Sequence, residues 1–116
     1  MKRIEETMLE AIKAGKAKCI GNTTVSSDGA VYLHGNKIAQ YNKDDNTLRL
    51  DHCGWHTITT RSRLDALCDV LDGNYRANIR DGILALTNTD TGERVALPAT
   101  LKAAGILCGM YVCCVM

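Results

Sequence analysis

The sequence of 116 residues has no Phe, one Pro, one Trp and four Tyr. A core must therefore rely on Leu, Ile, Val, Ala and Cys rather than on aromatic rings. The chain also lacks an excess of one charge, because 14 Lys and Arg stand against 13 Asp and Glu and the net charge is +1 at pH 7. Its overall charge thus gives no signature of a protein that binds a phosphate backbone. The length and the apolar content of 46% predict a single globular domain over residues 1–116.

The amino-terminal residues predict a helix rather than a secretion signal. The segment MKRIEETMLEAIKAG is charged and contains no apolar core of signal-peptide length. The six cysteines are therefore expected to be reduced thiols of a cytoplasmic protein, not a disulfide framework. An amphipathic helix that docks on a core is predicted over residues 2–14. Its apolar stripe consists of Ile4, Met8, Leu9 and Ile12.

The segment AVYLHGNKIAQY, residues 30–41, predicts a β-hairpin. Gly35 and Asn36 tolerate positive φ angles, so they are predicted to form a two-residue turn between the strands. Leu33 would then lie opposite Ile38, with one face of the hairpin buried and the other partly exposed. The partly exposed face carries two candidate binding residues, Tyr32 and His34.

The residues on either side of this hairpin predict further strands and a central helix. An extended run over Cys19–Val25 precedes the hairpin, and Leu48–Leu50 follows it as a short alternating strand. Helical spacing then predicts a helix that is capped by Thr59 or Ser62 and ended by Gly73. Its expected buried stripe consists of Leu64, Leu67, Cys68 and Leu71.

A second hairpin is predicted after the central helix. Residues 75–79 alternate between apolar and polar, Asp81–Gly82 supplies a tight turn, and residues 83–87 form the returning strand. A last strand is predicted over residues 93–97, ended by Pro98. Because the connections between strands are short, the predicted class is α+β, an antiparallel β-meander packed with an N-terminal helix and a central helix.

The segment DHCGWH contains the densest group of reactive side chains, His52, Cys53 and His56. Cys53 and His56 have the C-x2-H spacing of a zinc half-site, but no second pair with ligand spacing occurs. Cys53 beside either histidine is also a candidate thiol nucleophile, yet neighbours on a strand point to opposite faces. These residues are secondary candidates for a metal or thiol site, and the protein is expected to be non-enzymatic and without a cofactor.

Residues 101–116, LKAAGILCGMYVCCVM, form a tail without charge after Lys102. Its apolar run of about 14 residues is shorter than the roughly 20 that a membrane-spanning helix requires, so no membrane partner is expected. The tail is expected to be a final core strand or a contact between copies in a homo-oligomer, since it would promote aggregation if exposed. Its last four residues match a C-a-a-X prenylation signal that no polybasic stretch precedes.

The LHGNKIA hairpin and the GWHTITTRSRLDAL segment resemble a pattern of uncharacterised small proteins encoded by tailed bacteriophages. The resemblance covers about residues 23–90, brings no catalytic residues with it and does not include the cysteine-rich tail. It implies a phage accessory protein in the host cytoplasm that occupies a host protein, a nucleic acid or a signalling ligand. It also implies that the prenylation match is a coincidence.

Together these observations predict a non-enzymatic binding protein that engages a host or phage macromolecule, in the first place a protein. Trp and Arg are favoured interface anchors, so Trp55, Arg61 and Arg63 are candidate contacts. The alternative is a nucleic-acid-binding domain that gathers five arginines on one surface, namely Arg49, Arg61, Arg63, Arg76 and Arg80. A zinc or thiol site at residues 52–56 is the third interpretation.

Overall fold

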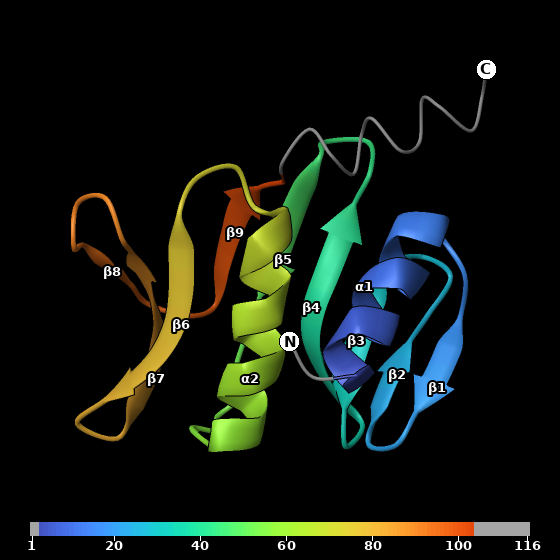
Figure 1. Cartoon of the computed structure of the whole chain (residues 1–116), viewed down its shortest axis with the longest axis horizontal. Coiled ribbons are helices and arrows are strands. Elements are labelled where there is room, and N and C mark those ends of the chain that lie inside the picture. Colours follow the sequence, from blue (N-terminus) through green and yellow to red (C-terminus); the bar gives the residue numbers. More distant parts are fainter. Residues whose placement is uncertain (1–2, 104–116) are drawn as a thin grey trace.

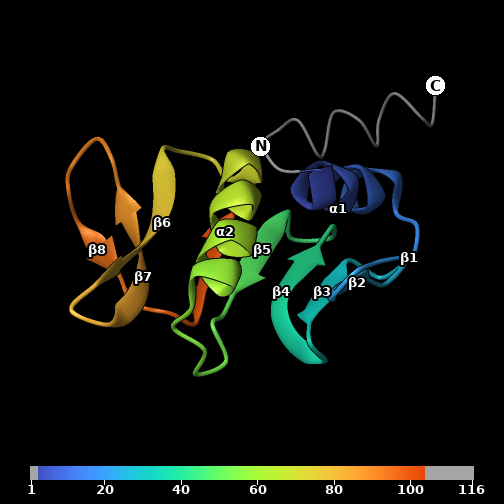
Figure 2. The same cartoon turned by 60° about the horizontal axis from the view of Figure 1, so that its bottom comes forward.

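The computed structural model describes residues 3–103, which form two helices, a short 3-10 turn and nine strands (Figure 1). The strands build a six-stranded and a three-stranded sheet with antiparallel pairing. Helices α1 (Arg3–Ala14) and α2 (Ile58–Leu67) lie on one face of the larger sheet, and the smaller sheet lies beyond α2 (Figure 2). The predicted α+β class is confirmed. No helix within the described range is long and apolar enough to cross a membrane.

The six-stranded sheet has the order β1-β2-β3-β4-β5-β9. Its strands are β1 (Lys18–Ile20), β2 (Thr23–Val25), β3 (Ala30–Leu33), β4 (Asn36–Asn42), β5 (Thr47–Leu50) and β9 (Ala99–Lys102). The prediction of one extended run over Cys19–Val25 is wrong, because the chain reverses at Gly21, whose φ is +58°. Ile20 pairs with Thr23 across this turn. A glycine in the left-handed region thus divides the run into a short hairpin.

The turn between β3 and β4 lies one residue earlier than predicted. His34 and Gly35 occupy its two central positions with φ angles of +51° and +81°, so Leu33 pairs with Asn36 instead of Ile38. The sequence favoured Gly35 and Asn36 because two-residue turns with positive φ prefer Gly and Asn to His. An irregularity within β3 shifts the register, and the apolar side chains of both strands still reach the core.

The central helix α2 begins at Ile58, with Thr57 as its N-cap residue. Thr57 Oγ1 accepts a hydrogen bond from the backbone N–H of Thr60 at 3.2 Å. The predicted caps, Thr59 and Ser62, lie inside the helix, so that prediction is wrong. The helix continues into a 3-10 turn, η1, at Cys68–Val70. The predicted buried stripe is confirmed for all four members, Leu64, Leu67, Cys68 and Leu71.

We expect Thr57→Ala to lower the free energy of unfolding by about 1 kcal/mol, because the first turn of α2 loses its side-chain cap. Urea denaturation followed by circular dichroism measures this change. Thr59→Ala is the matched control, since Thr59 is exposed and makes no capping hydrogen bond. Equal losses in the two variants would contradict the assignment of the cap.

The three-stranded sheet has the order β6-β7-β8. Its strands are β6 (Tyr75–Arg80), β7 (Ile83–Asn88) and β8 (Arg94–Val95). The hairpin around Asp81–Gly82 is confirmed, but β8 is shorter than the strand predicted over residues 93–97. Beyond Pro98 the chain forms β9, which pairs with β5, so the predicted meander is divided between two sheets. Residues 104–116, which include most of the predicted apolar tail and its prenylation match, lie outside the described residues.

One cluster of buried apolar side chains joins both helices to both sheets. α1 contributes Met8, Leu9 and Ile12 from its predicted stripe, and β5 contributes two fully buried leucines. Glu5 also lies on the buried side of α1, although the sequence pattern placed it outside the stripe. The core therefore contains a charged residue that needs a partner.

Candidate binding surface

Three large apolar side chains are exposed in residues 3–103, and they come from two segments that a hydrogen bond of His56 joins. Trp55 is 56% exposed, Ile58 69% and Ile83 54%. His56 lies between the first two and accepts a hydrogen bond from the backbone N–H of Leu84, the neighbour of Ile83, at 2.9 Å. We call Trp55, Ile58 and Ile83 the apolar surface. Clustered exposed apolar residues on a small protein are typical of a binding site.

A groove of about 280 Å³ lies beside Trp55, between the β3–β4 turn and the start of α2. Leu33 and Ile38 supply apolar lining, and threonines from the first turn of α2 supply hydroxyl groups. His34 also lines this groove, so the structure brings together two residues that the sequence predicted as contacts. Tyr32, predicted with them, is half-buried on β3 and does not line the groove.

Hydrogen bonds fix the turn that presents Trp55. The Trp55 backbone N–H donates to the His52 carbonyl oxygen at 2.8 Å, and the Gly54 N–H donates to His52 Nδ1 at 2.9 Å. The Cys53 thiol donates to the Lys37 carbonyl oxygen on β4 at 3.0 Å. With the contact to β7 described above, these bonds attach the turn to both sheets. A turn whose backbone is held in this way loses little conformational freedom when a partner binds.

His52 and His56 lie side by side within this turn, with ring centroids 4.2 Å apart. Each ring accepts a backbone N–H at Nδ1, from Gly54 and Leu84 respectively, which requires that this nitrogen carry no proton. Burial lowers the pKa of His52, the neighbouring His56 ring lowers it further, and Asp51 opposes both effects. The folded turn therefore favours the neutral form of His52.

We expect the free energy of unfolding to fall as the pH drops from about 7.5 to about 5.5. The folded state holds the pKa of His52 below its ordinary value of 6.5, so the unfolded chain takes up the proton first. The stability is therefore complete above 6.5 and declines as the pH falls through the lower pKa of the folded protein. Urea titrations at the two pH values measure the decline. In His52→Asn the decline should be smaller, and an unchanged decline would refute the assignment to His52.

The structure does not assemble the predicted zinc or thiol site. No group of three or more His, Cys, Asp and Glu side chains in the described part of the chain is placed to hold a metal ion. Burial raises the pKa of the Cys53 thiol, and Asp51 raises it further. The thiol also donates its proton to the Lys37 carbonyl oxygen. A protonated thiol with its hydrogen engaged is a poor nucleophile.

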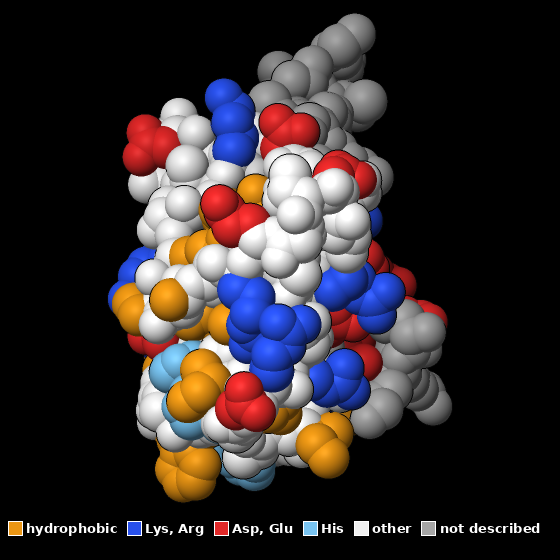
Figure 3. All heavy atoms as spheres, turned by 90° about the vertical axis from the view of Figure 1, so that its left-hand side faces the viewer, with side chains coloured by type: hydrophobic (Ala, Val, Ile, Leu, Met, Phe, Trp, Pro, Cys, Tyr) orange, Lys and Arg blue, Asp and Glu red, His pale blue; other side chains and the backbone are white. Residues whose placement is uncertain are grey.

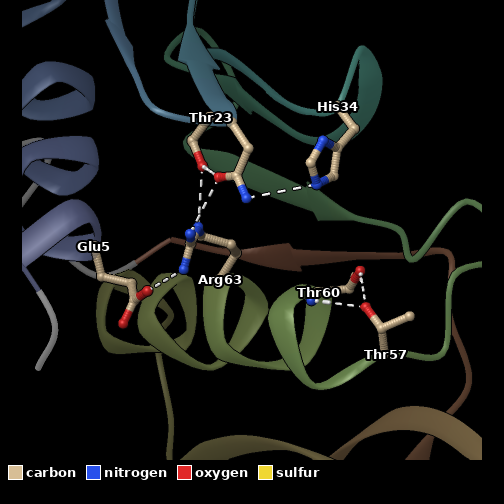
Figure 4. A network of polar contacts seen from close by, with 7 residues as sticks. Glu5, Thr23, His34, Thr57, Thr60 and Arg63 are labelled. Atoms are coloured by element: carbon tan, nitrogen blue, oxygen red, sulfur yellow. Dashed lines mark hydrogen bonds and ion pairs between the residues drawn. The ribbon is translucent and has the colours of Figure 1, made fainter.

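Arg63, predicted as an interface contact, is buried and serves the core instead. It is 5% exposed and forms an ion pair with Glu5 of α1, which is 4% exposed (Figure 4). Its other nitrogens donate to Thr23 Oγ1 at 3.0 Å and to Asn22 Oδ1 at 3.2 Å. Asn22 Nδ2 lies 3.5 Å from His34 Nε2, so this network extends to the hairpin that lines the groove. Arg63 therefore joins both helices to the sheet and is not accessible to a partner.

The other predicted arginines do not form one basic surface. Arg76 donates to both carboxylate oxygens of Asp65, at 2.9 and 3.0 Å. Arg49 lies on β5 in the other sheet, 3.7 Å from a carboxylate oxygen of Asp51. Arg61 is half-buried beside a shallow hollow that acidic side chains also line. Of the five arginines in the nucleic-acid hypothesis, three are thus paired with carboxylates.

Ile58 and Ile83 were not predicted from the sequence as parts of the candidate surface. Ile58 lies in a threonine-rich segment that alternation and capping explain equally well, and Ile83 lies at the first position of a strand after a turn. The sequence does contain one signal for the position of Ile83. The Asp81–Gly82 turn places Ile83 at the end of a hairpin. Only the fold shows that the start of β7 contacts His56, the neighbour of Trp55 in the sequence.

The fold and the surface define a small α+β protein that presents exposed apolar side chains beside a groove. The chain belongs to the family described as Kyanoviridae Gp96 protein, whose model matches residues 1–96. The members are bacteriophage proteins, so the phage origin that the sequence resemblance implied is confirmed. No match was found among the curated proteins or among the solved structures. The matched residues include both helices and the whole apolar surface.

Proposed function

We propose that the protein is a non-enzymatic phage accessory protein that binds a host or phage protein in the host cytoplasm through the apolar surface. One observation carries this proposal. The three exposed large apolar side chains, Trp55, Ile58 and Ile83, come from two separate segments that the hydrogen bond between His56 and Leu84 brings together. Leaving them in water is unfavourable, and a partner that covers them gains their transfer free energy.

Features of the Trp55 turn support a protein partner. Trp is among the residues that dominate the energy of protein interfaces, and such anchors fill pockets or border them. Trp55 borders a groove with both apolar walls and hydroxyl groups, which suits an inserted side chain and its backbone. The fixed turn keeps the ordering cost of binding low.

Photo-crosslinking in infected host cells tests this proposal. A chain with a benzophenone amino acid in place of Ile58 should form a crosslinked adduct with a defined partner protein. The matched control carries the same group in place of Thr100, which is exposed on β9 in the six-stranded sheet. A specific adduct from position 58 alone supports the proposal. The same adducts from both positions, or none from position 58, would contradict it.

The nucleic-acid alternative has less support, because carboxylates neutralise three of its five arginines. It requires binding to single- or double-stranded DNA that weakens steeply with salt. Fluorescence anisotropy with labelled oligonucleotides at low and high salt measures this directly. Tight, salt-sensitive binding would replace the protein-partner proposal.

A further inference from the structure

The outer face of the three-stranded sheet is basic. Its strands contain no Asp or Glu, and they contain three arginines, Arg76, Arg80 and Arg94. Ala77 and Leu84 point from the same sheet into the core, and the alternation of a strand therefore directs the arginines outward. Arg80 pairs directly with Ile83, so the basic face adjoins the apolar surface.

The charges of Arg80 and Arg94 lack a carboxylate partner within residues 3–103. Arg94 donates to the Ile83 carbonyl oxygen at 3.1 Å and to two uncharged side-chain oxygens. Arg80 is exposed, and Asp81 in the adjoining turn is its nearest acidic residue in the sequence. Arg76 differs, because a carboxylate neutralises it. Two positive charges thus remain beside Ile83.

Figure 3 shows this side of the molecule. Lys and Arg side chains gather in the middle of the view, and hydrophobic and His side chains lie below them together with one acidic side chain. The basic and apolar regions therefore adjoin on one accessible face. A partner that covers Ile83 must also accommodate the guanidinium groups of Arg80 and Arg94.

We infer that the partner segment bound here is an acidic protein segment, whose carboxylates pair with Arg80 and Arg94 while an apolar side chain contacts Ile83. This inference rests on the proposed function and specifies the chemistry of the partner. Hydrogen bonds already orient the guanidinium of Arg94, which reduces the ordering cost of a charge-assisted contact. Complementary charge of this kind accelerates association and disfavours basic partners.

A protein segment fits this surface better than a nucleic acid does. Sequence-independent binding of a nucleic acid uses several cations along the backbone together with aromatic rings that stack on bases. Here only two unneutralised arginines border the apolar surface, and Trp55 is the one aromatic residue among the three that form it. Carboxylates alternating with apolar side chains match this arrangement.

The crosslinking chain with the benzophenone group at position 58 also tests this inference. Sequencing of the linked partner peptide gives its net charge, and Arg80→Glu is compared with Arg49→Glu as the control for an added carboxylate. Arg49 is exposed on β5, away from the basic face. We expect an acidic linked peptide and a loss of adduct of about tenfold in Arg80→Glu, with little change in Arg49→Glu. Thermal melts verify that both variants are folded.

The outcomes separate this inference from the proposal on which it rests. A linked peptide without an excess of Asp and Glu, or an adduct that Arg80→Glu leaves unchanged, would overturn the inference and leave the protein-binding function in place. A crosslink to nucleic acid would overturn both in favour of the alternative. The absence of any adduct at position 58 would also overturn both.

Discussion

Replacing Glu5 with Gln is expected to lower the free energy of unfolding by about 3 kcal/mol, because it leaves Arg63 as an uncompensated buried charge. Both residues of the pair are almost fully excluded from water, since Glu5 is 4% exposed and Arg63 is 5% exposed. The guanidinium retains its hydrogen bonds to Thr23 and Asn22, but these acceptors carry no charge. Urea denaturation of the full chain measures the loss.

The double variant Glu5→Leu with Arg63→Met is the decisive comparison. Removing both charges abolishes the desolvation cost of the pair, so we expect the double variant to be more stable than Glu5→Gln. Asp51→Asn, at the more exposed pair with Arg49, keeps an oxygen that can accept the Cys53 backbone N–H and should change the stability by less than about 1 kcal/mol. A double variant as unstable as Glu5→Gln would show that packing, and not an unpaired charge, causes the loss.

Trp55→Ala is expected to weaken binding of the crosslinked partner about 30-fold, which corresponds to about 2 kcal/mol for an interface anchor. The free energy of unfolding should fall by only about 1 kcal/mol, because more than half of the Trp55 surface is in water and the turn is held by hydrogen bonds that do not involve its ring. Calorimetric titration with the purified partner measures the affinity, and urea denaturation measures the stability.

The control for Trp55→Ala is a variant that should lower the stability of the fold and leave the affinity for the partner unchanged. Leu50 is fully buried on β5, so Leu50→Ala should lower the free energy of unfolding by about 3 kcal/mol and leave the affinity of the folded protein unchanged. If Trp55→Ala instead abolishes the cooperative unfolding transition, Trp55 belongs to the core and the proposed surface loses its anchor.

The features of the fold that short-range patterns determine were predictable from the sequence. The Asp81–Gly82 hairpin, the stripe of α2 and the strand at Leu48–Leu50 each depend on residues within one turn or one helix period. The β3–β4 register was not predictable in this way. It depends on a positive φ at His34 and on an irregularity inside β3, and neither has a strong sequence signal.

The features that could not be predicted from the sequence depend on contacts between residues far apart in the chain. Arg63 lies in a polar segment, and such a sequence context is typical of a solvent-exposed residue. Its burial depends on Glu5, which α1 places against it. The candidate surface shows the same limit. Trp55 and His34 could each be proposed from the sequence, but the groove that both residues line depends on how the β3–β4 hairpin packs against α2. The contact of His56 with the start of β7, beside Ile83, also depends on the packing of the fold.

The pairing of β5 with β9 determines when the larger sheet is completed during synthesis. β5 ends at Leu50 and β9 begins at Ala99, so α2 and the entire three-stranded sheet leave the ribosome between them. A chain that ends before β9 leaves β5 without a neighbour on one side, whereas every pairing partner of β1 to β4 precedes β9 in the sequence. The last strand therefore covers an edge of β5 that, left unpaired, would be available for association between unfinished copies of this chain.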